Sequence, residues 1–433
     1  MRNTALAVLL AVAALGAGSG ARASTTMEVY PTGQYPADVQ NVQRAVDQGG
    51  TVLLKAANAA GTPTAFNFGP AVRGFGFVTL QRDVELVGEG AGSAVTTIDG
   101  GFYPVRGFGA ISASVRDISF DSPLRGAIYF VGPAASSVEI LRTRISHVVG
   151  GLIPGVGTVA EAMVVAGGRV AIDDNAVVDV AADFGIGITE LDSAGPVEVL
   201  RNYVSGTSTN SIECTRNHGV VRIENNVVRP GPTPDGFGGY GIEINGTGAY
   251  EVAGNDVLIE TAGGVGIFAL GALGFGFGPV TNPLIEKNDV VLRPAGSIGG
   301  SLFDDGIDLG GLVSGAYVGQ NKIEGSASSA FGLFDVAFDH TQPTDLGFNT
   351  FVGNDIADLQ SQLADIYLDH TSHDTVLKGK SGTVIDLGVN NRITGFTKGS
   401  GPGSGEQVSA ATHRRNLAKQ AAHETVRKSP ITP

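Results

Sequence analysis

Three carboxylates recur at equivalent places in short apolar segments of the chain. Glu213 in "NSIEC", Glu243 in "GYGIEI" and Asp308 in "DDGIDL" each follow an isoleucine, and Phe268 takes the same place in "GVGIFAL". Successive side chains of a strand point to opposite faces, so an inward isoleucine turns the next residue outward. We therefore expect these four side chains to form one line on the outside of the fold and to bind substrate there.

The same acids have the chemistry of a calcium site. Glu213 and Glu243 would be neighbours in this line, and Asp304 and Asp305 lie just before Asp308. Like charges this close raise a pKa or attract a cation, and an oxygen-only set suits Ca²⁺, which accepts about six to eight hard ligands in loose geometry. The sequence therefore predicts a calcium site formed by these five carboxylates. The alternative is that they are solvated surface acids.

Three basic residues follow Glu213 closely: Arg216, His218 and Arg222. A positioned base can remove a proton from a reacting group. Arg216 and Arg222 are the nearest candidates for a catalytic base or for binding a substrate carboxylate, and His218 is the next. An enzyme requires one of these arginines to converge on the acids, whereas a scaffold requires only an even, solvated face.

A second cluster of titratable residues occurs in "LDHTSHD", which contains Asp369, His370, His373 and Asp374. Two histidines and two acids in one turn could bind a ligand or transfer a proton. Their spacing does not match that of a zinc site. We therefore treat this cluster as a secondary candidate without a metal.

An asparagine recurs inside strand-like segments, although asparagine is depleted from strands. Six strong copies lie 24 to 33 residues apart, and weaker copies bring the total to nine units between about residues 138 and 395. The slots are occupied by Thr143, Asn175, Asn202, Asn226, Asn255, Asn288, Asn321, Asn354 and Asn391. A repeat of this length must be recognised before any other structural decision, because one unit cannot bury its apolar face alone.

The repeat predicts a β-solenoid. Each unit contains a second short apolar segment, and both segments are too short and too rich in valine and isoleucine for a helical solenoid. On a sharp turn, asparagine tolerates the left-handed conformation, and copies stacked about 4.8 Å apart can hydrogen-bond to one another. We therefore expect these asparagines to have a structural role.

The two ends of the chain differ from the repeat. Residues 1–23 combine Arg2 with an apolar run and end in Ala-Arg-Ala, which indicates a secretory signal cleaved after Ala23. Beyond it, Asp38 could cap a helix that covers the open end of the solenoid and ends at Gly49. Residues 24–397 then form the solenoid domain, and residues 398–433 a flexible linker with a basic tail.

Composition excludes some partners. The net charge of −14 argues against nucleic acid, because binding phosphates requires clustered Lys and Arg. The segment from Thr261 to Ile285 lacks charged residues, but its glycines and prolines indicate a rung and an apolar Gly/Phe loop, not a membrane span. Cys214 is the only cysteine and alternates with Ile212, so we expect a buried free thiol.

Several segments together resemble the pectin lyase-like superfamily: the N-terminal helix, "GGTVLL", "VTLQRDVELVGEG", "TTIDGG" and the asparagine-bearing units. The resemblance covers roughly residues 28–396. It implies an all-β, right-handed parallel β-helix and carbohydrate-active enzymes as the commonest function. In the lyase chemistry that it implies, calcium neutralises a uronate carboxylate while a base removes the proton at C5. No catalytic motif of the superfamily matches the chain.

The leading functional hypothesis is an exported protein, secreted, periplasmic or at the cell surface, that interacts with polysaccharide. If it is an enzyme, we expect a lyase acting on an acidic, uronate-containing polymer, or a glycoside hydrolase. The alternative is a non-enzymatic β-helix scaffold or binding protein. The missing motifs, the absence of tryptophan and an aromatic content of 7% favour this alternative.

Overall fold

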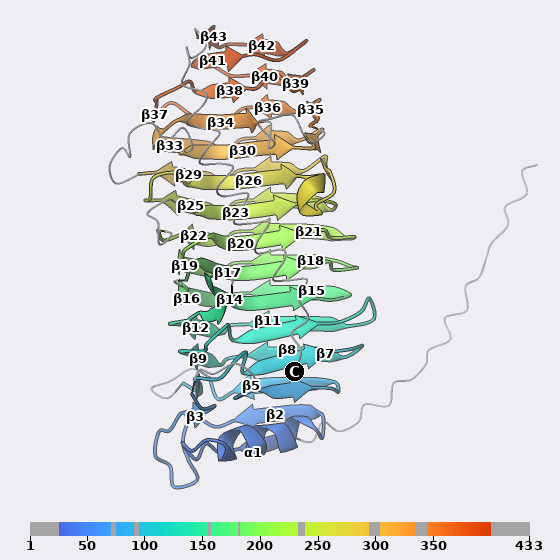
Figure 1. The fold of residues 1–433 in the computed structure, drawn as a ribbon, viewed down its shortest axis with the longest axis vertical. Helices are drawn as coiled ribbons and strands as arrows, with labels where there is room; N and C mark the ends of the chain where they lie inside the picture. Colours follow the sequence, from blue (N-terminus) through green and yellow to red (C-terminus); the bar gives the residue numbers. More distant parts are fainter. Residues whose placement is uncertain are drawn as a thin grey trace, which may run out of the picture.

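The computed structural model describes residues 26–70, 75–90, 95–154, 157–180, 182–232, 239–293, 304–334 and 344–399. In these residues the chain coils into a column of stacked strands, and three long sheets run along the column (Figure 1). Neighbouring rungs of the three sheets pair in parallel, apart from one added antiparallel strand. The predicted all-β, right-handed parallel β-helix is therefore confirmed.

Three sheets form the walls of the column. In stacking order, sheet 1 contains β1 (Thr26–Val29), β2 (Gly50–Leu54), β5 (Val84–Gly88), β8 (Ser112–Arg116), β11 (Ser137–Leu141), β15 (Arg169–Asp173), β18 (Val197–Leu200), β21 (Val220–Glu224), β24 (Ala249–Ala253), β28 (Leu284–Glu286), β32 (Tyr317–Gly319), β36 (Thr350–Val352), β40 (Val376–Lys378) and β42 (Arg392–Thr394). Sheet 2 contains β4 (Val78–Leu80), β7 (Val105–Phe108), β10 (Ile128–Val131), β14 (Gly157–Ala166), β17 (Phe184–Leu191), β20 (Asn210–Thr215), β23 (Tyr240–Asn245), β26 (Val265–Gly271), β30 (Asp305–Gly311), β34 (Ser329–Phe334), β38 (Ile366–Leu368), β41 (Thr383–Asp386) and β43 (Thr397–Lys398), with β13 (Gly151–Ile153) antiparallel to β14. Sheet 3 contains β3 (Phe66–Asn67), β6 (Thr97–Asp99), β9 (Ser119–Asp121), β12 (Arg144–Ser146), β16 (Ala176–Val180), β19 (Tyr203–Thr207), β22 (Val227–Arg229), β25 (Asp256–Ile259), β29 (Asp289–Leu292), β33 (Lys322–Ala327) and β37 (Leu359–Ser361). Two short pairs complete the described strands, β27 (Val280–Thr281) with β31 (Val313–Ser314) and β35 (Leu346–Gly347) with β39 (Ser372–His373).

The interior of the column is one continuous apolar core. A single cluster of buried side chains extends from Val29 in β1 to Val384 in β41. Valine and isoleucine dominate its inward positions, because branched side chains pack well against the pleated surface of neighbouring strands. The core is not divided along the column, so the described strands form one structural unit.

A series of buried asparagines runs up the turn between sheet 1 and sheet 3. The side chain of Asn255, for example, accepts hydrogen bonds from the backbone N–H (3.0 Å) and Nδ2 (2.9 Å) of Asn226. Its own Nδ2 donates to the carbonyl of Ile223 (2.8 Å) and to Oδ1 of Asn288 (2.9 Å). The same side-chain bond links consecutive members of the series from Asn175 to Asn354. These bonds satisfy polar groups that the turn would otherwise leave buried without partners.

The expectation that these asparagines adopt the left-handed conformation was wrong. The positive φ angle belongs to the preceding residue, as in Arg201 (53°), Asn225 (57°) and Gln320 (57°). That residue turns the chain, and the asparagine behind it then points inward with its amide free to bond along the column. The left-handed strain therefore falls on half-buried or exposed residues of several types.

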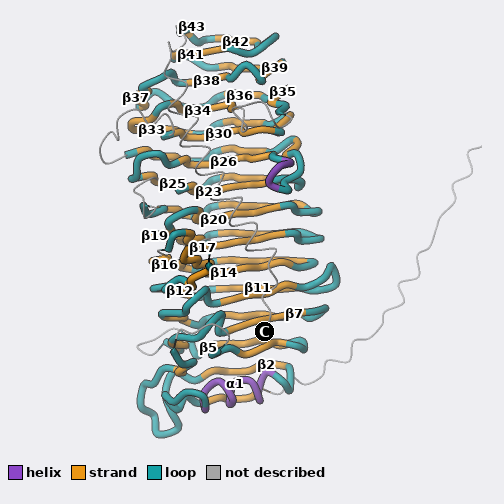
Figure 2. Tube along the Cα trace, in the orientation of Figure 1, coloured by secondary structure: helices purple, strands orange, loops and turns teal. Residues whose placement is uncertain are grey.

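Helix α1 (Ala37–Val46) covers the N-terminal end of the column (Figures 1 and 2). Val42 and Val46 are fully buried against the first rungs, as the helical spacing predicts. The predicted capping role of Asp38 was wrong, because Pro36 is the N-cap and no side chain caps the helix. The buried carboxylate of Asp38 instead accepts N–H groups from Thr32, Gly33 and Asn67 (2.7 to 3.0 Å), which fixes the chain around the helix.

The predictions for the two chain ends fall mostly on residues that the structure does not describe, whereas the uncharged segment is described. Residues 1–23, predicted as a signal sequence, lie outside the described residues, as does the predicted tail at 398–433 except for Lys398 and Gly399. The uncharged segment at 261–285 forms β26, the short 3₁₀ helix η1 (Leu273–Phe275), β27 and the start of β28, as the solenoid hypothesis expects. No helix in the described part of the chain is long and apolar enough to span a membrane.

We predict that Asn255→Ala destabilises the protein by about 3 to 5 kcal/mol, because it leaves several buried backbone and amide groups without partners. Asn354→Ala serves as the control, since Asn354 is the half-buried last member of the series and water can replace its bonds. Urea unfolding monitored by circular dichroism measures both. Equal losses in the two variants would contradict a cooperative role for the buried series.

Candidate functional site

The predicted register of the outer residues is confirmed in sheet 2. The isoleucines that precede them are fully buried and pair as Cα partners on successive strands. Glu213 pairs with Glu243, Glu243 with Phe268, and Phe268 with Asp308. These four residues form one line across β20, β23, β26 and β30, and we call it the carboxyl line.

A bend in each rung brings a second set of side chains to the same outer face. At this bend Gly266 and Gly306 point inward, and a Cβ on Gly266 would lie 2.5 Å from Val290 Cγ1 and 2.5 Å from the Gly306 carbonyl oxygen. The absence of a side chain therefore lets the bend pack on the core. The residue before each bend turns outward, which places Asn210 and Asp305 beside the carboxyl line. Strict alternation along a strand does not predict these two positions.

Glu213 and Glu243 are held together by Asn210. The Nδ2 group of Asn210 donates to Oε2 of Glu213 (3.1 Å) and also to Oε2 of Glu243. Thr215 Oγ1 donates to the other oxygen of Glu213 (3.2 Å). Glu213 is 3% exposed and Glu243 is fully buried. The two carboxyl groups lie on the outer face, as expected, but they are buried there and bridged by Asn210.

Asp305 and Asp308 form a second pair two rungs further along the column. Both are buried, and the backbone N–H of Ser329 donates to Asp305 Oδ1 (2.8 Å). Burial, followed by the repulsion of neighbouring negative charges, raises the pKa of both carboxyl groups well above the usual Asp value. A hydrogen bond between the two acids lowers the pKa of Asp305 and raises that of Asp308. At least one of the two acids is therefore expected to keep its proton at a pH where an ordinary aspartate is ionised.

Asp304 directly precedes this pair, but it has a hydrogen-bond partner of its own. Its carboxylate accepts the backbone N–H of Gly263 (2.5 Å) on the neighbouring rung. Burial raises its pKa to about 6. Asp304 thus anchors the start of β30 to the turn before β26, and it titrates in a range where ordinary aspartates are fully ionised.

The five acids are not gathered into one ligand set. Within the described residues, no group of three or more His, Cys, Asp or Glu side chains is arranged to hold a metal ion. The acids instead form two pairs, Glu213 with Glu243 and Asp305 with Asp308, separated by the Phe268 rung. The calcium site therefore stays a prediction.

The three basic candidates lie away from the carboxyl line. Arg216 forms a two-pronged ion pair with Asp192 in the turn of the neighbouring rung (2.9 and 3.0 Å), and His218 is exposed in the same turn. Arg222 lies on β21 in sheet 1, where it pairs with Glu198 (3.4 Å) and Glu224 (3.1 Å). The chain turns between β20 and β21, so residues close in sequence face different sides of the column.

The two histidines of the secondary cluster at 369–374 bind different aspartates. His373 lies between Asp345 (Nε2 to Oδ1, 2.9 Å) and Asp374 (Nδ1 to Oδ2, 3.0 Å), and the hydrogen bond to Asp374 is the main cause of its raised pKa. His370 pairs separately with Asp369 (2.7 Å). The two histidines therefore do not form a common site.

The N-terminal part of the same outer face contains an arginine without a carboxylate partner in the described structure. Arg106 continues the line of the carboxyl residues through β7 and β10, where its Cα partner is Tyr129. It is 4% exposed, lies 3.7 Å from the Phe77 ring centroid, and donates to the carbonyl of Phe102 (2.9 Å). Burial lowers the pKa of Arg106 to about 10. Sequence inspection missed this residue because it lies before the recognisable repeats.

A buried polar group accompanies Arg106. Glu161 Oε2 accepts hydrogen bonds from Tyr103 Oη (3.2 Å) and Arg125 Nη2 (3.1 Å). Tyr129 stacks at a tilt near Tyr103, with ring centroids 5.3 Å apart, and near the exposed Phe108 at 5.8 Å. The outer face of sheet 2 therefore carries aromatic and cationic groups at one end and paired acids further along.

An inward carboxyl group was also missed. Glu190 in β17 pairs with Cys214 in β20, and both are fully buried in the interior. Asn217 Nδ2 donates to Glu190 Oε2 (2.7 Å), but burial dominates and raises the pKa of Glu190 to about 8. Cys214 is a buried free thiol, as predicted. Counting two residues on from the inward Ile188 would have identified Glu190.

The Gly/Phe loop packs onto the outer face of sheet 2. Phe277 is 2% exposed and joins Phe268, Tyr240, Val265 and Leu270 in a separate apolar cluster. Phe268 is therefore buried beneath neighbours on its own side of the sheet, and its ring lies 5.1 Å from that of Tyr240. The predicted apolar Gly/Phe loop therefore covers this rung, between the two acid pairs.

The fold and this face define a right-handed parallel β-helix protein with paired carboxyl groups on the outside of one sheet. No family model and no curated protein matches the chain. Among solved structures, the chain is similar to the Dettilon tailspike protein (gp208), with 13% identity, a TM-score of 0.49, and coverage of 84% of this chain and 68% of that one.

The tailspike protein of E. coli bacteriophage HK620 in complex with pentasaccharide is also similar. It is 12% identical with a TM-score of 0.36, over 83% of this chain and 68% of that chain. A mutant of that tailspike, also in complex with pentasaccharide, has 12% identity and a TM-score of 0.44 over 86% and 78%. The site must therefore be interpreted from the residues of this chain.

We predict that Glu190 makes the stability of the protein depend on pH. An acid whose pKa is raised by folding stabilises the fold fully only below its unfolded pKa, and this contribution is lost as the pH rises through about 8. The loss is on the order of 4 to 5 kcal/mol, at about 1.4 kcal/mol per pKa unit. Glu190→Gln should remove most of it.

Urea unfolding at pH 5 and pH 8.5 tests this prediction, with the exposed Glu260→Gln as the matched control. The Glu190→Gln substitution should change stability little at pH 5 and increase it by a few kcal/mol at pH 8.5. If wild type and Glu190→Gln respond to pH in parallel, then Glu190 is not the titrating group.

Proposed function

We propose that this is an exported, polysaccharide-interacting β-helix protein that hydrolyses glycosidic bonds at the outer face of sheet 2. The observation that carries the proposal is the Asp305 and Asp308 pair, in which burial and mutual repulsion keep one carboxyl group protonated at a pH where an ordinary aspartate is ionised. Glycoside hydrolysis requires a protonated acid to donate to the leaving oxygen and a second carboxylate as base or nucleophile.

The carboxyl line contains candidates for both the protonated acid and the second carboxylate. Asp308 and Glu243 lie on either side of Phe268 in the pairing register. Two rungs separate their backbones by roughly 10 Å, at about 4.8 Å per rung. Asn210 holds the Glu243 carboxylate towards β20, so the assignment requires the Glu243 side chain to turn towards Asp308 to reach the roughly 6.5 to 9.5 Å typical of inverting hydrolysis. In this assignment Asp308 is the acid and Glu243 the base, and the buried Phe268 ring is the spacer between them.

Lyase action on a uronate polymer is the other enzymatic hypothesis. It requires a base at C5 and a cation that neutralises the uronate. Arg216 is paired with Asp192, and Arg222 lies on sheet 1, so neither is placed beside the acids of sheet 2. The paired acids therefore support hydrolysis better, and the reaction products distinguish the two chemistries.

One observation favours the non-enzymatic scaffold. The carboxyl groups of the line are 0 to 3% exposed, and Asn210 and Thr215 already bind the Glu213 carboxylate. Buried, hydrogen-bonded acids can serve as internal braces between rungs, at the cost of their desolvation. A scaffold would retain its fold and lack any turnover.

We predict that Asp308→Asn and Glu243→Gln each lower hydrolysis by about 100-fold or more, since each removes one half of the acid and base pair. Release of reducing ends from a panel of neutral and acidic polysaccharides measures this, and ultraviolet absorbance detects unsaturated products. Asp289→Asn, an exposed acid of sheet 3, is the control. Unsaturated products would favour the lyase, and no product from any polymer would favour the scaffold.

We further predict that calcium, if it binds the acids of sheet 2, raises the melting temperature relative to chelator. Binding to the folded state alone stabilises it by mass action, by about 2.7 kcal/mol at a hundredfold excess over Kd. The Glu213→Gln, Glu243→Gln double variant should lose the shift. Equal melting temperatures with calcium and with chelator in the wild type would remove calcium from the proposal.

A further inference from the structure

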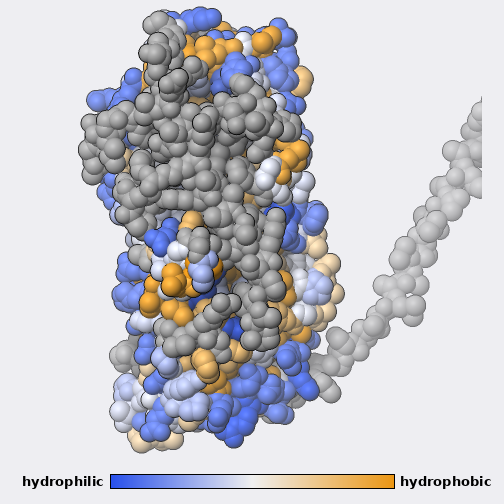
Figure 3. Space-filling view, viewed as in Figure 1, coloured by the Kyte–Doolittle hydropathy of each residue, from blue (hydrophilic) through white to orange (hydrophobic). Residues whose placement is uncertain are grey.

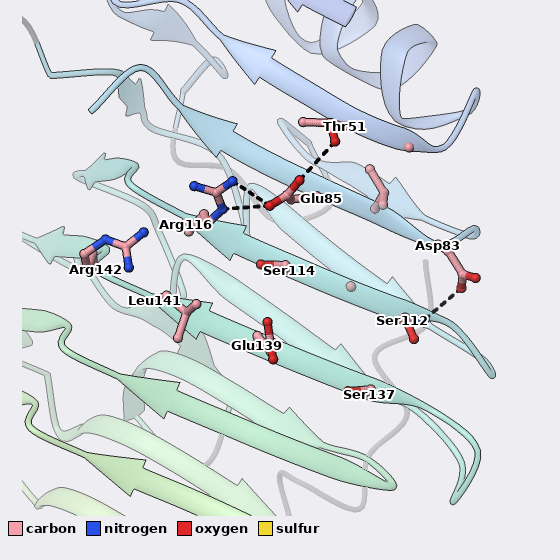
Figure 4. A pocket seen from close by; sticks show the side chains of 13 residues that line it. Thr51, Asp83, Glu85, Ser112, Ser114, Arg116, Ser137, Glu139, Leu141 and Arg142 are labelled. Carbon is pink, nitrogen blue, oxygen red and sulfur yellow. Dashed lines mark hydrogen bonds and ion pairs between the residues drawn. The ribbon is translucent and has the colours of Figure 1, made fainter. Parts of the chain in front are cut away.

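A separate groove lies on the outer face of sheet 1, near the N-terminal end of the column. It has a volume of about 660 Å³ and is formed by β2, β5, β8 and β11 together with the turn before β5 (Figure 4). This volume is within the range of about 300 to 1,000 Å³ usual for ligand sites. The groove belongs to a different sheet from the carboxyl line, so it is not part of the site described above.

The groove is hollow because small side chains occupy its floor. Ser114 lies between Glu85 and Glu139 on one outward line of Cα partners. Ser112 and Ser137 form the neighbouring outward pair. The short Ser114 side chain thus separates the longer side chains of Glu85 and Glu139. The space above Ser114 is therefore open. Figure 4 shows Ser114 between the two acids.

Most of the charge at the groove is already neutralised. Arg116 donates from Nε (2.8 Å) and Nη2 (2.6 Å) to Glu85, whose other oxygen accepts from Thr51 (3.0 Å). The hydrogen bond from Arg116 keeps the pKa of Glu85 below its usual value. At the rim, Arg142 holds Asp117 through two bonds of 2.8 Å. The cations are therefore not available to an anionic polymer.

Glu139 is the exception. Within the described structure its carboxylate has no hydrogen-bond or ion-pair partner, and the hydroxyl groups of Ser114 and Ser137 beside it make no side-chain hydrogen bond either. The groove thus offers one free acceptor and a row of hydroxyl groups that can both donate and accept. No aromatic ring of the described residues lines it, so a flat apolar ligand has no surface to stack on.

We propose that this groove binds a neutral, hydroxyl-rich glycan segment. The ring hydroxyls of such a glycan donate to Glu139 and exchange hydrogen bonds with Ser114 and Ser137. A net charge of −14 and neutralised arginines disfavour an acidic polymer at this face. The shallow floor runs across several rungs, which suits an extended chain. The proposal is independent of hydrolysis at sheet 2, because the groove can anchor a polymer whether or not the polymer is cleaved.

Binding of neutral oligosaccharides derived from glucan, mannan and galactan to the full chain tests the proposal by isothermal titration. An acidic oligogalacturonide and a lysine-rich peptide are the comparison ligands. We expect at least one neutral oligosaccharide to bind. Glu139→Ala should weaken this binding tenfold or more by removing the acceptor, and Ser114→Tyr should do so by filling the groove. Both positions are on the outer face, and melting temperatures verify that each variant folds.

The matched control is Glu198→Ala, on the same outward line two rungs from Glu139 and outside the groove. It should bind as the wild type does. Asp308→Asn should also bind normally, which separates this site from the proposed hydrolytic one. The proposal is overturned if no neutral oligosaccharide binds, if Glu139→Ala and Ser114→Tyr both bind like wild type, or if the acidic or cationic ligand is preferred.

Discussion

The structure depends on the parallel pairing of each rung with the next. Every backbone N–H and C=O of a strand must find a partner on the neighbouring coils, because the interior offers no water. This requirement fixes the register, and a fixed register places equivalent residues of successive units directly above one another. Side chains therefore act as columns: isoleucine on isoleucine inside, asparagine on asparagine at the turn, and acid on acid outside.

Stacking has opposite consequences for amides and carboxylates. An amide both donates and accepts, so a column of asparagines satisfies itself, as the four side-chain bonds of Asn255 show. A carboxylate only accepts, so stacked acids repel and need a donor or a proton between them. Asn210 is the donor for the stacked Glu213 and Glu243. Asp305 and Asp308 instead lie on one strand, β30, where burial and their neighbouring negative charges raise both pKa values. The carboxyl groups of sheet 2 therefore need donors or protons, which the asparagine series does not.

The outer faces of sheets 1 and 2 differ in whether their polar side chains are open to solvent and free of partners. On sheet 2 the polar groups are buried and mutually bonded, and the Gly/Phe loop packs against Phe268 between the two acid pairs. On sheet 1 small residues leave an open groove in which, among the described residues, Glu139 is the acid without a partner. On the face shown in Figure 3, hydrophilic and hydrophobic residues are interspersed among the described residues. One fold thus carries enclosed, paired acids on sheet 2 and an open groove on sheet 1.

The sequence by itself determined the solenoid, the terminal helix and the register of the carboxyl line, because these follow from periodic patterns that are local to each unit. It did not determine how each rung bends. Glycine at the bend turns Asp305 outward, the turn after β20 carries Arg222 to another sheet, and the left-handed conformation falls on Arg201, not on Asn202. Burial of the acids and the hollow above Ser114 depend on neighbours from other rungs. Such neighbours are decided only when the coils stack, since no local pattern encodes which side chains meet across them.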